Sequence, residues 1–349
     1  MLKINTLAVR GVEKVNYNYL YNFIMGIVLA LYCCLGFSQT LLPSDYKTTL
    51  QDVYQKYQSD TSGKIASYIP ELAKANPNRF AISVATIDGE IFSIGDSDVP
   101  FSLQSISKVF AYALALQDND QKIIFNTIGL DATGETFNSI ITIEKKPARS
   151  HNPYVNAGAI QTTSYIKGKN PEEQWHRMFS LLKSLSDEHL FFSNRIYQSE
   201  TKTNTRNHAI AQLLKSHGLL RGEPRDVLDR YTKACSVMVT TKQLALMGAT
   251  LANNGINPIT KKQIIPASVT RHVVSQMLVN GLYEKSGTWF VTIGVPAKSG
   301  VSGGLLAIIP NKMAIAVFSP PLDSTGTSVR GQKVIQELSN LWRLHLLER

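Results

Sequence analysis

Cysteine is scarce in this chain, which has three cysteines, Cys33, Cys34 and Cys235, among 349 residues. A small disulfide-rich scaffold needs many more, and a cysteine-based metal site needs them clustered. The seven histidines are scattered and form no pair at helical spacing. We therefore expect neither a disulfide framework nor a metal site.

Charged residues are also few, at 18%, whereas hydrophobic residues make up 44%, a balance that excludes intrinsic disorder. The net charge is +10, yet basic residues gather only in pairs such as Lys145-Lys146 and Lys261-Lys262. A nucleic-acid surface needs larger basic clusters, so we expect a solvated basic surface with at most a weak attraction for anions and no nucleic-acid partner. The sequence has no phosphate-binding loop or nucleotide fingerprint, and no cofactor is expected.

Long hydrophobic runs are absent except for Phe23 to Phe37, which is shorter than the roughly 20 residues of a membrane span. Lys3, Arg10 and Lys14 precede it, and Gly36-Phe37-Ser38 offers small residues at the positions a signal peptidase inspects. This pattern predicts a signal peptide over residues 1–38, cleaved near Ser38, and an exported, periplasmic or secreted protein. Two alternatives are an uncleaved membrane anchor and a lipid on one of the two leader cysteines.

Removal of the leader leaves Cys235 as the single cysteine, so no intrachain disulfide could form. Its neighbours Ala234, Val237 and Met238 are apolar. We interpret it as a small buried residue without a chemical role.

The body of the chain, residues 39–349, is predicted as a single catalytic domain with strands near both ends and helices between them. Alternation from Phe80 to Ile94 around Asp88-Gly89 indicates a hairpin, after short helices within Lys47 to Lys74. Periodicity predicts helices over 105–117, 172–185, 207–217, 223–234, 241–253 and 329–347, and strands over 289–293, 305–309 and 313–318. The expected fold class is α+β: an antiparallel sheet built from both chain ends, flanked by helices, with a helical subdomain inserted over about 105–285.

Ser105 and Lys108 form the first candidate catalytic pair, at the predicted start of a helix. A lysine one turn after a serine lies on the same face, where its neutral amine can accept the hydroxyl proton. The flanking residues Ile106, Val109 and Phe110 are apolar, a setting that lowers a lysine pKa by desolvation. A bare serine and lysine three apart occurs often, and an ordinary solvated lysine is the alternative.

Lys298-Ser299-Gly300 is the second motif, followed by Val301-Ser302-Gly303-Gly304. An early Ser-x-x-Lys on a helix and a late Lys-Ser/Thr-Gly beside a strand are together the layout of penicillin-recognising enzymes and class A β-lactamases. The alternative for these glycines is a structural bulge in a strand.

Six collinear segments from about Gly63 to the C-terminus resemble the serine-dependent glutaminase family. They are Phe101-Ser-Leu-Gln-Ser-Ile-Ser-Lys108, His151-Asn-Pro-Tyr-Val-Asn-Ala-Gly158, Ser199-Glu200 with Arg206-Asn207, Tyr231 with Cys235-Ser236, Gly281-Leu-Tyr283, and Pro296 to Gly304. The resemblance implies a serine β-lactamase-like fold and hydrolysis of L-glutamine to L-glutamate and ammonia without a cofactor. It also implies a homo-oligomer, a dimer or a tetramer.

The resemblance also implies a role for each matching residue. Ser105 would attack the γ-carboxamide, Lys108 would take its proton, and the N–H groups of Ser105 and Val301 would form the oxyanion hole. Tyr283, with Tyr231 as a second candidate, would relay a proton to the leaving ammonia. The remaining substrate-binding residues would be Glu200 for the α-ammonium, Asn156, Asn207 and Tyr68 for the α-carboxylate, and Gln104 at the border of the pocket.

These roles suit a free amino acid, whose α-carbon carries both charges. An unpaired buried Glu200 would disfavour amides that lack the ammonium. The alternatives are that Asn156 and Asn207 cap helices, and that Tyr68, Tyr231 and Tyr283 are core tyrosines with satisfied hydroxyls.

The sequence departs from the family pattern at Tyr154, where methionine is common, and in an unusually polar stretch between Glu200 and Asn207. The competing functions are an exported β-lactamase or peptidoglycan peptidase, which predicts a Ser-x-Asn motif not found in a comparable setting, and a glutamine sensor without turnover.

Overall fold

The computed structural model describes residues 25, 43, 45–144, 149–187 and 189–348. By its contacts the chain divides after Leu41, and the fold below is that of the second unit, Leu42–Arg349. The expected signal peptide at 1–38, with Cys33 and Cys34, lies outside the described residues apart from Met25. Within the described part of the chain, no helix combines the length and the apolar character needed to span a membrane.

Strands from the two ends of the chain form one antiparallel sheet, as the sequence predicts. The strand order is β2-β1-β8-β7-β6, and β1 pairs with β8 from Ala81↔Phe318 to Thr86↔Met313. The strands are β1 (Ala81–Thr86), β2 (Ile91–Gly95), β6 (Ala297–Ser299), β7 (Gly304–Ile309) and β8 (Met313–Phe318).

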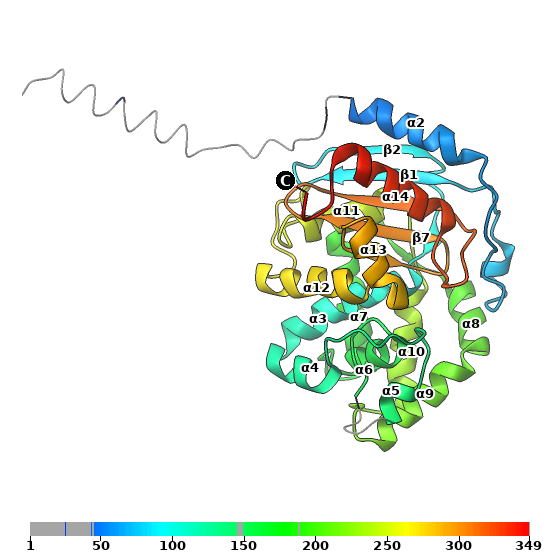
Figure 1. Ribbon diagram of the computed structural model, residues 1–349. Helices are drawn as coiled ribbons and strands as arrows, with labels where there is room; N and C mark the ends of the chain where they lie inside the picture. Colours follow the sequence, from blue (N-terminus) through cyan, green and yellow to red (C-terminus); the bar gives the residue numbers. More distant parts are fainter. Residues whose placement is uncertain (1–24, 26–42, 44, 145–148, 188, 349) are drawn as a thin grey trace, which may run out of the picture. The chain divides into compact units, whose positions relative to one another are not determined.

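Helices cover both faces of this sheet, which explains why the central strands are buried on both sides (Figure 1). Helices α2 (Tyr46–Gln58) and α14 (Val329–Trp342) pack on one face, against residues such as Ile82 and Val317. Helix α11 (Thr241–Ala252) packs on the other face, where Leu244 meets Leu306 and Ala316. Because successive side chains of each strand point to opposite faces, the sheet separates two hydrophobic cores.

The sequence between β2 and β6 is mostly helical and carries a second, three-stranded sheet of order β3-β5-β4. Its strands are β3 (Phe101–Ser102), β4 (Phe191–Phe192) and β5 (Val237–Val239). The helices are α3 (Ser107–Asp118), α4 (Gln121–Ile128), α5 (Ile141–Glu144), α6 (Asn156–Ser164), α7 (Pro171–Leu185), α8 (Asn194–Thr203), α9 (Thr205–Ser216), α10 (Pro224–Cys235) and α12 (Ala267–Asn280).

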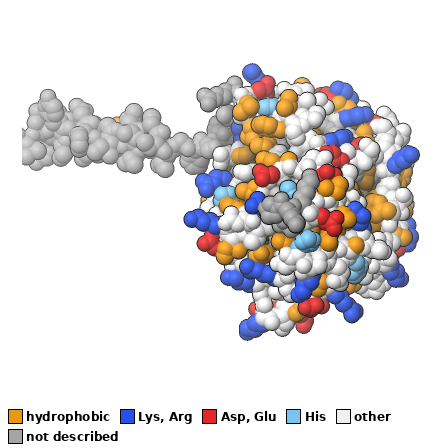
Figure 2. Space-filling model, turned by 60° about the horizontal axis from the view of Figure 1, so that its bottom comes forward, with side chains coloured by type: hydrophobic (Ala, Val, Ile, Leu, Met, Phe, Trp, Pro, Cys, Tyr) orange, Lys and Arg blue, Asp and Glu red, His pale blue; other side chains and the backbone are white. Residues whose placement is uncertain are grey.

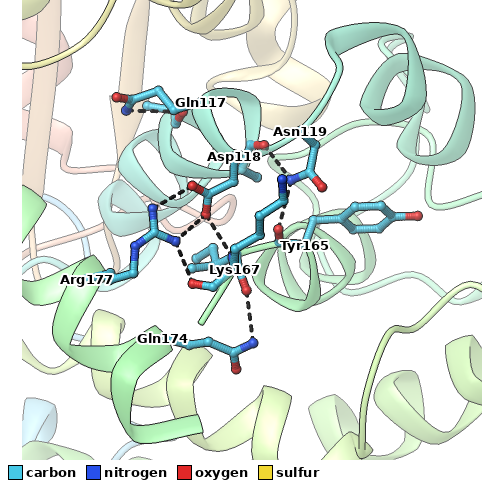
Figure 3. Close-up of polar contacts among 10 residues, drawn as sticks. Gln117, Asp118, Asn119, Tyr165, Lys167, Gln174 and Arg177 are labelled. Atoms are coloured by element: carbon cyan, nitrogen blue, oxygen red, sulfur yellow. Dashed lines mark hydrogen bonds and ion pairs between the residues drawn. The ribbon is translucent and has the colours of Figure 1, made fainter. Parts of the chain in front are cut away.

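An ion pair fixes the far end of α3 against α7 (Figure 3). Both carboxylate oxygens of Asp118 accept hydrogen bonds from Arg177, at 2.6 and 2.5 Å, and one also accepts from the backbone N–H of Lys167. Asn119 donates to the carbonyls of Ala115 and Tyr165, 2.8 Å each. Helix α3 is therefore held at its C-terminal end against α7 and the segment before it.

Two sequence predictions fail near the C-terminus. Most of the expected strand 289–293 is helix α13 (Ser286–Thr292); Trp289 and the C-cap residue Ile293, four residues apart, are buried, while Val291 is 77% exposed. A short apolar run fits a strand and one turn of helix equally well. Helix α14 ends at Trp342 rather than residue 347, because Arg343 adopts a left-handed conformation, and Leu341 lies outside the buried face.

The basic surface expected from the composition is dispersed on the face that Figure 2 shows. Lysine and arginine side chains lie scattered there, with acidic and hydrophobic side chains among them.

Candidate active site

Ser105 lies in a 3-10 turn, Gln104–Ile106, directly between β3 and α3. Gln104, just before it, is buried and has a positive φ of 49°, a region that non-glycine residues rarely occupy. The hydroxyl of Ser107 donates to the Gln104 carbonyl at 2.7 Å and closes the turn. Backbone strain of this kind is concentrated at functional sites. The predicted position of Ser105 at the start of a helix is confirmed, with a tighter first turn than expected.

Lys108 is buried in the first turn of α3, with 2% of its surface exposed. Its Nζ donates to Asn156 Oδ1 at 2.6 Å and to the Tyr154 carbonyl at 3.1 Å. Burial lowers the pKa of Lys108 to about 8, and the negative potential of Glu200 opposes this only in part. The predicted desolvated lysine is confirmed, so the neutral amine that a general base requires is accessible near pH 8.

Tyr283 connects Ser105 to a second buried lysine. Its side chain interacts with Ser105, which partly opposes the rise of the Tyr283 pKa caused by burial, and its hydroxyl accepts a hydrogen bond from Lys298 Nζ at 3.1 Å. The Lys298 amine is also 4.3 Å from the centre of the Tyr283 ring and donates to the Ser299 carbonyl. Burial first, and then the nearby Lys108, hold the pKa of Lys298 well below its usual range. Tyr283 is therefore a second group, besides Lys108, that can exchange a proton with the Ser105 hydroxyl.

Glu200 is the buried carboxylate of the site, on α8. Its carboxylate is bonded to Gln104, whose amide nitrogen lies 3.3 Å from Glu200 Oε2. Burial raises the pKa of Glu200 to about 7, while Gln104 and Lys108 act in the opposite direction. A carboxylate so poorly compensated favours a cationic ligand group beside it.

Asn156, on α6, and Asn207, on α9, bond to each other: Asn156 Nδ2 donates to Asn207 Oδ1 at 2.9 Å. Asn156 Oδ1 accepts from Lys108 and, at 3.4 Å, from the hydroxyl of Tyr231 on α10. Neither asparagine is a helix cap, because Val155 and Asn204 hold the N-cap positions of α6 and α9. The capping alternative is therefore wrong for both residues.

The glycines after Lys298 form the tight turn between β6 and β7. Gly300 N–H donates to the Gly304 carbonyl at 2.8 Å, and Gly303 has a φ of 105°. A Cβ at Gly300 would lie 2.7 Å from the Leu103 carbonyl, so glycine lets this turn approach the Ser105 segment. The glycines are therefore structural as residues of a turn rather than of the strand bulge considered from the sequence, and the turn also brings Val301 into the site.

A cavity of about 210 Å³ collects nine of the ten predicted site residues. Lys108 lies beneath its floor, in contact with Asn156. The nine are Tyr68, Gln104, Ser105, Asn156, Glu200, Asn207, Tyr231, Tyr283 and Val301. Tyr68 is 55% exposed, so it is not a core tyrosine. The volume is below the roughly 300–1,000 Å³ of sites for drug-sized ligands, and fits a small metabolite.

Several lining residues carried no sequence-based role, namely Ile69, Phe137, Asn138, Thr203, Asn204, Arg206, Cys235 and Ser299. Arg206, Cys235 and Ser299 stood inside recognised motifs, and Thr203 and Asn204 stood in the unusually polar stretch, so position in the sequence held a signal for five of the eight. Cys235 is buried, and burial raises the pKa of its thiol, in agreement with its interpretation as an inert residue. Among the residues that the structure describes, no cluster of potential metal ligands occurs.

Comparisons with known proteins agree on one family. The family model described as Glutaminase matches residues 63–347. A glutaminase of Trichormus variabilis is 45% identical over 306 residues, which cover 88% of this chain and 91% of that protein. A glutaminase of Colwellia psychrerythraea is 46% identical over 299 residues, which cover 86% of this chain and 96% of that protein.

Solved structures give the same result. A structure described as a probable glutaminase, ybaS, has a TM-score of 0.86 at 41% identity and covers 88% of this chain and 100% of its own. The glutamate form of a protein named Mglu has a TM-score of 0.84 at 37% identity; the match covers 88% of this chain and 71% of that one. The fold is thus that of these proteins: a mixed α/β structure with antiparallel sheets and many helices.

Proposed function

The chain belongs to the glutaminase family and is a glutaminase, and from that premise we propose that it hydrolyses L-glutamine through an acyl-enzyme on Ser105. The observation that carries the proposal is the contact network around this serine. Its hydroxyl meets Tyr283, and Lys108, with a lowered pKa, lies one helical turn away. The position of Ser105 just before α3, with Lys108 in the first turn of that helix, also supports the serine β-lactamase-like description of the fold.

In the first half of the reaction, neutral Lys108 takes the proton of Ser105 as the serine oxygen attacks the carbonyl carbon of the glutamine γ-carboxamide. The C–N bond breaks, and Tyr283, in contact with Lys298, passes a proton to the departing amide nitrogen. No Ser105–Lys108 hydrogen bond occurs among the described residues, and this separation closes on substrate binding. The backbone N–H groups of Ser105 and Val301 hold the developing oxyanion.

In the second half, water attacks the acyl carbon, its proton passes to the same basic groups, and the ester bond to Ser105 Oγ breaks. Glutamate leaves and the serine regains its proton. Tyr231 is the second candidate for the proton relay, through its contact with Asn156.

The other end of the pocket recognises the α-carbon of the substrate. Glu200 pairs with the α-ammonium, which restores the ionised state that burial disfavours. Asn156, Asn207 and Tyr68 donate hydrogen bonds to the α-carboxylate, and Gln104 orients Glu200. The related protein Mglu has been solved in a glutamate form, which supports a pocket that accommodates this product.

The test is release of ammonia and glutamate from L-glutamine by purified protein lacking residues 1–38, beside Ser105→Ala. We expect turnover that the substitution removes, with the melting temperature retained. Cys235→Ala serves as a matched control in the same pocket. Turnover unchanged in Ser105→Ala would overturn the acyl-enzyme, and turnover of a penicillin instead of glutamine would favour the β-lactamase alternative.

We also propose that residues 1–38 direct export and that the protein forms a homo-oligomer. The leader sequence supports the first, and the family resemblance supports the second. Mass spectrometry of the secreted protein would give a mature N-terminus near Ser38 or Gln39. Light scattering would give a dimer or tetramer mass, and a monomer mass would exclude the assembly.

A further inference from the structure

Asn204 lies between the active-site cavity and a second cavity. It joins α8 to α9, four residues after Glu200 and three before Asn207. The second cavity, of about 390 Å³, is lined by Tyr197, Thr201, Asn204, His208, Arg225, Asp226, Leu228, Asp229 and Thr232. Among the described residues, Asn204 is the one that lines both. Asn204 is therefore part of the wall that separates them.

The fold does not hold this side chain by hydrogen bonds. Asn204 is 8% exposed, and its Oδ1 has no hydrogen-bond partner within the described part of the chain. Its backbone carbonyl accepts from His208 N–H as the first bond of α9, which any residue provides. Buried side-chain oxygens are nearly always paired in folded proteins, so an unpaired one in a cavity wall points to water or ligand. Removal of the side chain breaks no protein hydrogen bond.

The second cavity can hold a polar group with a negative end. Thr232 Oγ1 is buried in its wall and also lacks a partner among the described residues. Two acidic residues line it as well: Asp229 is paired with Lys233 at 2.7 Å, whereas Asp226 forms no ion pair among the described residues. Arg225 supplies the cationic group of the lining. A carboxylate attached to a short extension would therefore find donors there.

We propose that Asn204 is a specificity-determining residue, which restricts the active site to free glutamine by closing its α-carbon end against this second cavity. The inference rests on the proposed function, since Glu200 and Asn207 on either side of Asn204 bind the α-carbon groups. Glutamine extended at its α-carboxyl keeps the free ammonium for Glu200 and directs the added residue toward Asn204. The reacting amide and the bonds broken are the same.

The experiment compares kcat/KM for L-glutamine, L-glutaminyl-glycine and glycyl-L-glutamine in the wild type and in Asn204→Ala. We expect the ratio of glutaminyl-glycine to glutamine to rise at least about tenfold, the scale on which pocket shape discriminates between substrates. Glycyl-L-glutamine has no ammonium at its glutamine α-carbon and remains a poor substrate. Asn204 is the N-cap of α9 but makes no side-chain cap hydrogen bond, so alanine at this position removes no capping bond. Asn204→Ser is measured beside it as a smaller change.

Two further variants distinguish a specific role of Asn204 from a general loss of order in the active site. Thr205→Ala, at the next, exposed position and lining neither cavity, leaves the ratio unchanged. Arg225→Gln added to Asn204→Ala reduces the gain, because the glycine carboxylate loses its cationic partner. Folded Asn204 variants that hydrolyse glutamine with an unchanged ratio would overturn the inference. A gain with glycyl-L-glutamine would overturn it too. Absence of glutamine hydrolysis in the wild type would instead reject the proposed function.

Discussion

Two buried cationic side chains in this molecule have opposite surroundings. Arg330, on α14, is 1% exposed and donates to four oxygens. They are Ser319 Oγ and the carbonyls of Gln58, Pro77 and Arg79. Lys108 is equally buried but has only two partners, Asn156 Oδ1 and the Tyr154 carbonyl.

The two side chains also differ in whether they keep their charge when buried. Burial lowers the pKa of Arg330, but a guanidinium starts so high that it stays charged, and its partners tie the end of α2 to β8 and the loop before β1. For Lys108 the same physical cause brings the pKa to about 8. A buried cation with complete hydrogen bonding stabilises the fold, whereas one with incomplete bonding becomes a base.

Lys108→Met should produce the largest change and only in chemistry. We expect kcat to fall by about 10⁴-fold, the scale of losses when one member of a catalytic unit is removed. The free energy of unfolding should stay within about 1 kcal/mol of wild type, because only two acceptors lose a donor and the cost of burying the ammonium is removed. Steady-state kinetics and urea unfolding measure the two quantities. Loss of stability without loss of kcat would contradict the comparison.

Arg330→Met should show the reverse pattern. Four acceptors lose their donors, and we expect a loss of about 4 kcal/mol in the free energy of unfolding. The value of kcat per folded molecule should not change, since this residue is absent from the lining of the active-site cavity. Urea unfolding is the measurement, with Lys333→Met, on the same helix and partly exposed, as the control. A kcat reduced in proportion to stability would show that the two regions are coupled.

Local patterns predicted most of the active region from the sequence. The Ser105–Lys108 spacing and the hairpin of β1 and β2 depend on neighbours a few residues apart, and the structure has both. The pairing of β1 with β8 followed from strands at both ends of the chain. The individual roles of the site residues came from the family resemblance, and they stay predictions until variants are measured.

Features that depend on tertiary packing could not be predicted. The bond between Lys108 and Asn156 exists only because α3 packs on α6, and the contact between Lys298 and Tyr283 needs the turn that gives Tyr283 a positive φ. Strands β3 and β4 have two residues each, too few to show a period. Nothing in the sequence around Arg330 distinguishes it from a solvated arginine.

The pH profile tests the smallest expected effect. Ionised Glu200 (pKa about 7) and neutral Lys108 (pKa about 8) are both needed, so kcat/KM rises with pH through both values. On logarithmic axes, the slope should be about two below pH 7 and about one between pH 7 and 8. Glu200→Gln removes one of these two titrating groups and should leave a slope of about one throughout. From pH 8 to pH 6, kcat/KM of this variant should therefore fall about tenfold less than that of the wild type.

The control for the profile is Arg330→Met, which should keep the wild-type shape because the guanidinium does not titrate in this range. A slope of two that persists in Glu200→Gln would assign the lower pKa to another group. Because Lys298 is buried beside Tyr283, with its pKa also held low, Lys298→Met is the variant that would then locate the second proton. If Lys298→Met loses the steeper low-pH part of the profile, the two titrating groups are Lys108 and Lys298, on either side of the Ser105 hydroxyl.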